Sequence, residues 1–164
     1  MIVTSDGIVG GRIQAKYGKH GDQFSKDGVP TCSLPVSIQD APENTKSFAL
    51  VLEDKDAIPV CGFSWIHWTA ANITRTELRE NESRCADFPQ GATSFSSAVQ
   101  GLDRFETACY GGMTPPDAPH TYELHVYALD CLLNLKQGFY ANELYWQMQD
   151  HILAACTLRG IYVN

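Results

Sequence analysis

The chain has 164 residues, the size of one domain with a single hydrophobic core. Its composition, 44% hydrophobic and 19% charged, is that of an ordinary globular protein. The formal net charge of −7 repels phosphate backbones and anionic membrane surfaces, so nucleic acid is not expected as a partner. We therefore expect residues 1–164 to form one globular domain.

No stretch of the sequence approaches the ~20 apolar residues of a transmembrane segment, and the first ten residues lack the pattern of a signal peptide. The six cysteines are each more than twenty positions from the next, so no CxxC pair is present to hold zinc or to serve as a redox motif. We expect six free thiols in a cytoplasmic protein that contains no metal and no cofactor.

The first forty residues are rich in glycine, proline and serine, and they are expected to form loops and short strands. Residues 47–53 (SFALVLE) are apolar at odd and even positions alike, which is typical of a central strand covered on both faces. The acidic turn that follows ends this strand.

Residues 63–73 (FSWIHWTAANI) alternate as a strand does. The alternation places Trp65 and His67 on one face and Ile66 and Trp68 on the other. His67 is therefore expected to point away from Trp68.

Three segments of different character lie between residues 74 and 130. Residues 74–98 are polar with mixed charge and are expected to form a long surface excursion. Residues 109–119 (CYGGMTPPDAP) combine two glycines with three prolines, which predicts a stiff, irregular loop. Residues 121–130 (TYELHVYALD) alternate again, and His120 shares the parity of Tyr122 on the apolar face.

The one convincing helical pattern covers residues 142–156, with Asn142 as its N-cap. Its apolar stripe consists of Leu144, Met148, Ile152 and Ala155. A last short strand is expected over residues 157–163. Many strands with one late helix predict a mainly β domain.

Polar side chains collect at strand ends and in the stiff loop. The spacing of Asp54 and Asp56 puts both carboxylates on one side of an extended segment, and His67 lies in the next strand. A carboxylate beside an imidazole fixes its tautomer or helps to bind a metal. Each pattern is also common without function, because acids often form a solvated turn and a single strand histidine is often a core residue.

Three runs of the sequence, in order, resemble the phosphatidylethanolamine-binding protein family, most strongly its bacterial, Raf-kinase-inhibitor-like branch. They are SFALVLEDKDAIPVCGFSWIHWTAANI, YGGMTPPDAPHTYELHVYALD and ANELYWQMQDHILAACTLRGIYVN. The resemblance extends over nearly the whole chain, so it implies a single domain of this type. It also implies two antiparallel sheets in a sandwich-like arrangement, with a C-terminal helix and few other helices.

The resemblance further implies a small anion-binding pocket. Carried over to matching positions, its residues are Asp54, Asp56, His67, Tyr110, Gly111, Gly112, Pro115, Pro116, His120 and Tyr122. Two positions depart from the family pattern: Lys55 stands where proline is usual, and Ile38 where tryptophan is common.

In this pocket we expect the amides of Gly111 and Gly112 and the imidazoles of His67 and His120 to donate hydrogen bonds to the anion. Asp54 or Asp56 would orient an imidazole rather than attract the ligand. Because His120 begins a strand beside a loop, its replacement is expected to leave the fold intact.

The predicted function is binding of a small anion, namely phosphate or a phosphorylated headgroup, without catalysis. The main alternative is a phosphoesterase-like hydrolase that uses the same Asp and His side chains as metal ligands or general base. A thiol enzyme based on Cys109 ranks third. The resemblance also leaves open a protein partner, such as a kinase that the chain regulates, and a homodimer.

Overall fold

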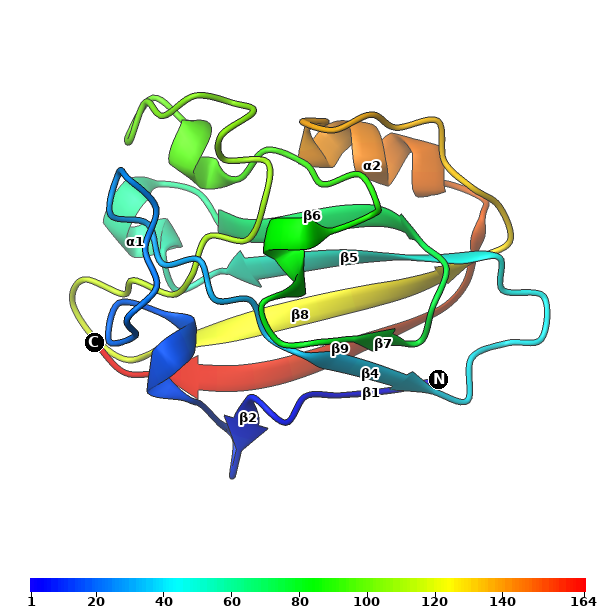
Figure 1. The fold of residues 1–164 in the computed structure, drawn as a ribbon, viewed down its shortest axis with the longest axis horizontal. Helices are drawn as coiled ribbons and strands as arrows, with labels where there is room; N and C mark the ends of the chain where they lie inside the picture. The colour runs from blue at the N-terminus through cyan, green and yellow to red at the C-terminus, as the bar shows by residue number, and fades with distance from the viewer.

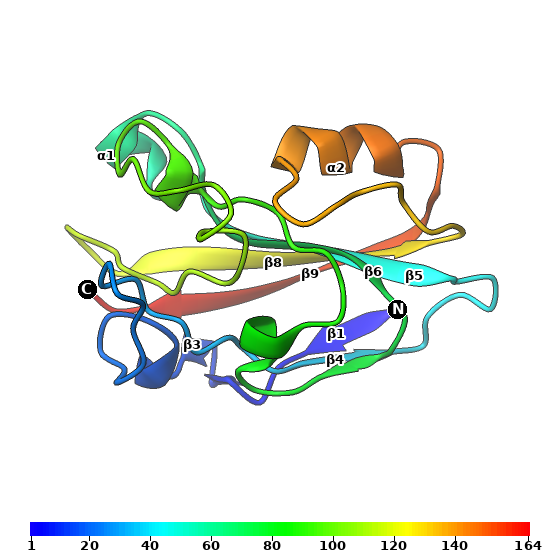
Figure 2. The same cartoon turned by 45° about the horizontal axis from the view of Figure 1, so that its top comes forward.

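A computed structural model describes residues 1–164 as two β-sheets packed face to face, with the helices on the outer face of the larger sheet (Figures 1 and 2). The larger sheet has six strands in the order β2-β3-β9-β8-β5-β6, and the smaller has three in the order β1-β4-β7. The strands are β1 (Ile2–Thr4), β2 (Ile8–Val9), β3 (Arg12–Ile13), β4 (Val36–Gln39), β5 (Ser47–Asp54), β6 (Trp65–Ile73), β7 (Glu77–Leu78), β8 (His120–Leu129) and β9 (Ile152–Tyr162). The predicted mainly β fold with two sheets and few helices is confirmed.

The helices are short. They are α1 (Ile58–Cys61) and α2 (Ala141–Met148), with 3₁₀ turns η1 (Ala15–Tyr17), η2 (Glu82–Cys85) and η3 (Ser94–Ser96). Neither helix is long and apolar enough to cross a membrane. The strand pairs are antiparallel except β3 with β9, which run parallel where Arg12 lies opposite Ile161.

Strand β5 lies between β8 and β6 and is buried on both faces, as its sequence predicted. Phe48, Leu50 and Leu52 point into the main core between the two sheets. Ala49 and Val51 belong to a second apolar cluster under α2. Apolar residues at every position therefore serve two cores, one on each side of the sheet.

The prediction of a helix over residues 142–156 is wrong at its C-terminal end. Helix α2 ends at Met148, and Ile152 begins β9, which pairs with β8 from Leu129 back to His120. The reversal between helix and strand is made at Asp150, whose φ is +65°. A long antiparallel ladder satisfies the backbone groups of β8, and this outweighs the local helical spacing.

The N-terminal end of this helix also differs from the prediction. The helix begins at Ala141, and the N–H of Tyr140 donates to the Glu143 carboxylate at 2.7 Å, so Asn142 is not the N-cap. The buried residues Leu144 and Met148 do face the core as the apolar stripe predicted.

Asp150 should be sensitive to side-chain branching at Cβ, because left-handed backbone costs roughly 1–2 kcal/mol for an ordinary L-residue. We expect Asp150→Val to lower the free energy of unfolding by about 1–2 kcal/mol, and Asp150→Gly to leave it unchanged or raise it. Urea denaturation of the two variants measures the difference. Equal stability of the valine and glycine variants would contradict the assignment of the turn to Asp150.

Residues 74–98 are not a plain surface excursion. Leu78 in β7 pairs with Val36 in β4 and closes the smaller sheet. Phe88 is buried in the main core, and Phe95 in η3 is buried at one end of β6. Polar and charged residues together dominate the segment, but its few apolar side chains fix its path over the core.

Candidate functional site

A cavity of about 190 Å³ is lined by residues from the end of β5, from the starts of β6 and β8 and from α1. Figure 1 shows that α1 lies beside this end of the larger sheet. The lining residues of the cavity are Asp54, Ala57, Val60, Cys61, Trp65, His67, Phe95, Val99, Gln100, Thr114, Pro116, His120 and Tyr122. We call it the histidine cavity. Five of the ten residues predicted from the resemblance line it: Asp54, His67, Pro116, His120 and Tyr122.

Strand pairing brings these residues together from distant parts of the chain. Asp54 in β5 lies opposite Tyr122 in β8 on one side and opposite Trp65 in β6 on the other. Adjacent strands hold opposed residues close, so three strands supply one wall. The predicted burial of His120 and Tyr122 on one face of β8 is confirmed.

A bulge in β6 sets the position of His67. Leu52 pairs with Trp68 and Glu53 with Ile66, so His67 is the extra residue on β6 and faces no partner in β5. Bulges re-aim side chains and often occur beside functional sites. The His67 ring meets Tyr122 edge to face, with ring centroids 5.2 Å apart.

The prediction that Trp68 lies on the face opposite Trp65 and His67 is wrong, because the bulge at His67 interrupts the alternation of β6. Trp65 pairs with Asp54 and Trp68 with Leu52, which share one face of β5, so both indoles lie on the inner face of the sheet. Trp65 and His67 both meet the ring of Phe95 edge to face. Trp68 packs instead against Tyr110 in the main core.

His120 is held between two carboxylates. Its Nδ1 lies 2.7 Å from Oδ2 of Asp54, and its Nε2 lies 2.9 Å from Oδ1 of Asp117. Burial lowers the pKa of His120, but the hydrogen bonds to Asp54 and Asp117 outweigh it, so the pKa is raised overall. Both ring nitrogens therefore donate, and the imidazolium form is favoured.

The burial of this pair corrects an expectation from the sequence. His120 and Asp54 are 2% and 3% exposed, so His120 neutralises a carboxylate inside the protein rather than standing at a dispensable strand start. Asp117, on the loop before β8, has a side chain that is 60% exposed. Asp54 is fixed by the core, whereas Asp117 reaches His120 from the solvent side.

His67 has the opposite character. Its Nδ1 donates to the carbonyl oxygen of Gly111 at 2.7 Å, and its Nε2 makes no hydrogen bond with the protein. Burial lowers the pKa of His67 more than the bond to Gly111 and the charge of Asp54 raise it. The carbonyl acceptor places a proton on Nδ1, and burial favours the neutral form of the ring, in which Nε2 carries a lone pair.

Two buried donors that belong to residues lining the cavity have no hydrogen-bond partner in the protein. They are the hydroxyl of Tyr122 and the indole Nε1–H of Trp65. Burial and the charge of Asp54 raise the pKa of Tyr122 far above its ordinary value, so the hydroxyl keeps its proton. Unpaired buried polar groups are rare because each costs stability, and they mark places where a ligand or ordered water completes the bonding.

The amides of Gly111 and Gly112 are not available as anion donors in this structure, contrary to expectation. The Gly111 N–H donates to the carbonyl of His67 at 2.8 Å, and the Gly112 N–H donates to the carbonyl of Pro30 at 2.8 Å. Both positions need glycine for close packing. A Cβ would lie 2.5 Å from the Phe95 ring at Gly111, and 2.4 Å from the Tyr17 carbonyl oxygen at Gly112.

The other three predicted residues lie around the cavity without lining it. Asp56 accepts from the backbone N–H of Thr121 at 2.8 Å, which ties the acidic turn to the start of β8. Tyr110 is buried in the main core and donates to the carbonyl of Tyr17. The carbonyl of Pro115 accepts from Lys19.

Most of the apolar wall of the cavity was not predicted from the sequence. Trp65 could have been found, because it shares the parity of His67 in the same strand. Phe95 comes from residues 74–98, whose composition indicated only solvent exposure, and Val99 directly follows them. Val60 comes from α1, which the sequence did not predict.

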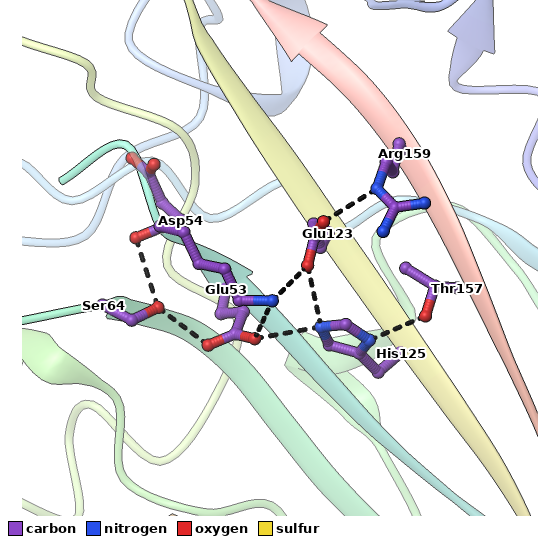
Figure 3. Close-up of polar contacts among 8 residues, drawn as sticks. Glu53, Asp54, Ser64, Glu123, His125, Thr157 and Arg159 are labelled. Carbon is purple, nitrogen blue, oxygen red and sulfur yellow. Dashed lines mark hydrogen bonds and ion pairs between the residues drawn. The ribbon is translucent and has the colours of Figure 1, made fainter. Parts of the chain in front are cut away.

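The departures from the family pattern lie outside the cavity. Ile38 is in β4 and is buried between the sheets. Lys55 contacts Glu53 at 3.2 Å and Glu123 at 2.5 Å on the outer face of the sheet. Glu53 also lies 3.0 Å from Nε2 of His125 there, as Figure 3 shows.

This outer cluster of Glu53, Glu123 and His125 contains the ligand types of a metal site. However, Lys55 and Arg159 supply two positive charges to the two carboxylates, with Arg159 donating to Glu123 at 2.7 Å. The cluster is therefore satisfied as an ion-pair network.

All six cysteines are free thiols, as predicted. Cys109 lines a second cavity of about 280 Å³ on the other side of Phe95, and burial raises the pKa of its thiol. Cys61 lines the histidine cavity, where its Sγ donates to the carbonyl of Phe63. The environment of Cys109 therefore does not promote a thiolate nucleophile.

The fold and this site define a class of protein: a two-sheet β domain with a histidine-containing cavity at one end of its larger sheet. The sequence matches the family model "Phosphatidylethanolamine-binding protein" over residues 4–163. It is 49% identical over 152 residues to the uncharacterized protein YxkA of Bacillus subtilis, covering 89% of this chain and 90% of YxkA. It is 33% identical over 165 residues to a UPF0098 protein of Chlamydia trachomatis, and the match covers 99% of this chain and 98% of that protein.

Solved structures agree with this assignment. CT736 of Chlamydia trachomatis, a phosphatidylethanolamine-binding protein homologue, superposes with a TM-score of 0.80 at 30% identity over 99% of this chain and 96% of CT736. YbcL of E. coli, described as a new member of the mammalian phosphatidylethanolamine-binding protein family, superposes with a TM-score of 0.77 at 27% identity. The match covers 99% of this chain and 97% of YbcL. The chain belongs to the phosphatidylethanolamine-binding protein family.

Proposed function

We propose that the histidine cavity binds a small oxyanion, namely phosphate or a phosphorylated headgroup. The observation that carries the proposal is a pair of buried donors without a partner, the Tyr122 hydroxyl and the Trp65 indole N–H, which belong to two residues that line the cavity. An oxyanion accepts from both and removes the cost of leaving them unpaired. Donation to a charged oxygen is stronger than donation to a neutral one.

The charge of the site supports an anion once Asp117 is considered. Asp54 and His120 form a neutral buried pair, and the Nε2–H of His120 points away from Asp54. The carboxylate of Asp117 already accepts from this N–H. An anionic oxygen thus fits at this position, and because Asp117 is exposed, an incoming anion can exchange with it.

The rest of the wall is apolar and suits an organic group attached to the anion. Val60 and Val99 are about half exposed at the cavity, and Phe95 and Pro116 complete the apolar lining. Apolar walls with a few convergent polar groups are typical of small-molecule sites.

Removal of the internal competitor should strengthen anion binding. We expect Asp117→Asn to bind inorganic phosphate about tenfold more tightly than the wild type, because a negative charge next to the bound anion is lost. Calorimetric titration in an amine buffer free of oxyanions measures both affinities. Asp87→Asn is the matched control, because Asp87 is an exposed acid that pairs with Arg75 and does not line the cavity.

The outcomes separate clearly. Tighter binding in Asp117→Asn alone supports an anion site at His120. No phosphate binding by the wild type or by Asp117→Asn would refute the proposed function. An equal gain in Asp87→Asn would show that only the net charge matters.

Hydrolysis is the second candidate function, and one observation favours it. The lone pair of His67 Nε2 is unpaired at the cavity, which is the state that a general base needs. Release of phosphate from p-nitrophenyl phosphate tests it. Multiple turnovers that disappear in His67→Gln would replace binding by catalysis as the function of the site.

A further inference from the structure

We propose that the histidine cavity selects oxyanions that carry a proton, so that it prefers inorganic phosphate and phosphate monoesters to sulfate and phosphate diesters. This inference rests on the proposed function and adds the chemical class of the ligand. His67 is its specificity-determining residue.

The hydrogen bonding of His67 fixes which ring nitrogen carries the proton. A carbonyl oxygen only accepts, so the 2.7 Å contact between Nδ1 and the Gly111 carbonyl places the proton on Nδ1. The ring is 2% exposed and is enclosed by Phe95 and Tyr122, which meet it edge to face. An apolar enclosure disfavours a second proton, so Nε2 is an acceptor.

The backbone around the bulge in β6 fixes the orientation of the His67 ring. The backbone N–H of Gly111 donates to the His67 carbonyl, and the Gly111 carbonyl accepts from the His67 ring, so two bonds hold the residue against one loop position. Rotation of the ring would break the bond to Gly111 and place Nδ1, with its lone pair or proton, in an apolar setting. The acceptor at Nε2 is thus part of the fold.

The groups without a partner therefore fit a ligand that both accepts and donates hydrogen bonds. Tyr122 and Trp65 offer donors, while His67 offers an acceptor. A phosphate with a P–O–H group satisfies all three, because its bare oxygens accept and its hydroxyl donates to His67. Sulfate is fully deprotonated near neutral pH and would place a lone pair against the lone pair of Nε2.

A phosphate diester also has no P–O–H group near neutral pH, because two of its oxygens are esterified and its single acidic proton is already lost. Phosphatidylethanolamine, the lipid in the family's name, is such a diester. A monoester has a second pKa of about 6, so a substantial protonated fraction is present at about pH 6.5. A site that accepts from a ligand O–H rejects analogues without it more strongly than an apolar pocket rejects a missing methylene.

A ligand panel of four anions tests the selectivity on the unmodified protein. Inorganic phosphate, methyl phosphate, dimethyl phosphate and sulfate are titrated at one ionic strength and about pH 6.5, where a monoester retains its proton in part. We expect phosphate and methyl phosphate to bind at least about tenfold more tightly than dimethyl phosphate and sulfate, because the latter leave a buried acceptor unsatisfied.

A variant of His67 and a matched control then assign the selectivity. In His67→Gln the side-chain amide can donate as well as accept, so the ratio of phosphate to sulfate affinity should fall toward one. His125→Gln carries the same substitution in β8, where His125 pairs with Glu53 in the outer cluster, and should keep the wild-type ratio. Nitrogen-15 NMR of the unliganded protein reports the His67 tautomer even if His67→Gln fails to fold.

Each outcome supports or refutes the inference. The expected ratio, with a protonated Nδ1 and a bare Nε2 on His67, supports it. Equal binding of all four anions, or a His67 protonated at both nitrogens at about pH 6.5, refutes the selectivity and leaves the anion site intact. Binding of none of the four anions refutes the proposed function itself.

Discussion

Replacement of His120 by alanine is expected to lower the free energy of unfolding by about 3–5 kcal/mol, the usual effect of removing one partner of a buried ion pair. The Asp54 carboxylate, 2.7 Å from His120 and 3% exposed, would be left as an uncompensated buried charge. Denaturant unfolding, monitored by tryptophan fluorescence, measures the loss.

The double variant Asp54→Asn with His120→Ala separates charge from packing. It removes the stranded carboxylate, so it should be more stable than His120→Ala alone. His151→Ala is the control, because His151 pairs with Asp130 on the surface with its side chain 46% exposed. That control should change stability by no more than about 1 kcal/mol, and an equally small effect at His120 would contradict the buried pair.

The contribution of His120 should also depend on pH in a defined direction. The folded-state pKa is raised above the ordinary value of about 6.5, so the stabilisation is present in full below about pH 6.5. It is lost as the pH rises through the raised pKa, because the folded state then releases the proton that held the pair together. In His120→Ala this part of the pH dependence should disappear.

Replacement of Tyr122 by phenylalanine should separate binding from stability. We expect phosphate affinity to fall about ten- to a hundredfold, because a hydrogen bond to a charged oxygen contributes about 1.5–3 kcal/mol. The free energy of unfolding should stay unchanged or rise, since the hydroxyl is buried and has no partner in the protein. Calorimetric titration and urea unfolding of the same preparation give both quantities.

Tyr162→Phe is the matched control for this variant. The Tyr162 hydroxyl donates to the carbonyl of Ala15 at 2.7 Å and accepts from the N–H of His20 at 3.0 Å, outside the cavity. Its removal should lower stability by about 1–3 kcal/mol and leave phosphate affinity unchanged. If Tyr122→Phe behaved like Tyr162→Phe, the Tyr122 hydroxyl would have a structural role and the anion site would lose its main support.

The sequence predicted which residues lie at the candidate site more accurately than it predicted what each of them does there. Period-2 alternation in β6 and β8 placed His67 with Trp65, and His120 with Tyr122, on faces that the structure confirms. The roles of these residues could not be predicted, because they depend on atoms far away in sequence. His120 pairs with Asp54, 66 positions away in sequence, and His67 takes its hydrogen-bond partner from Gly111, 44 positions away.

What the sequence determined by itself is that the segments of β5, β6 and β8 are strands, that β5 is buried on both faces, and that His120 and Tyr122 lie on the buried face of β8. Residues apolar at both parities specified a central β5, and two glycines with three prolines specified an irregular loop before β8. These features are local, because alternation and backbone stiffness are properties of adjacent residues.

Tertiary structure alone decided three further features. β9 replaced the last turns of a predicted helix because β8 needed a hydrogen-bonding partner along its full length. The bulge at His67 arose from the register between β5 and β6, which no single strand encodes. Phe95 entered the cavity wall because the long connection folds back over β6, and the burial of one aromatic ring outweighs the polar composition around it.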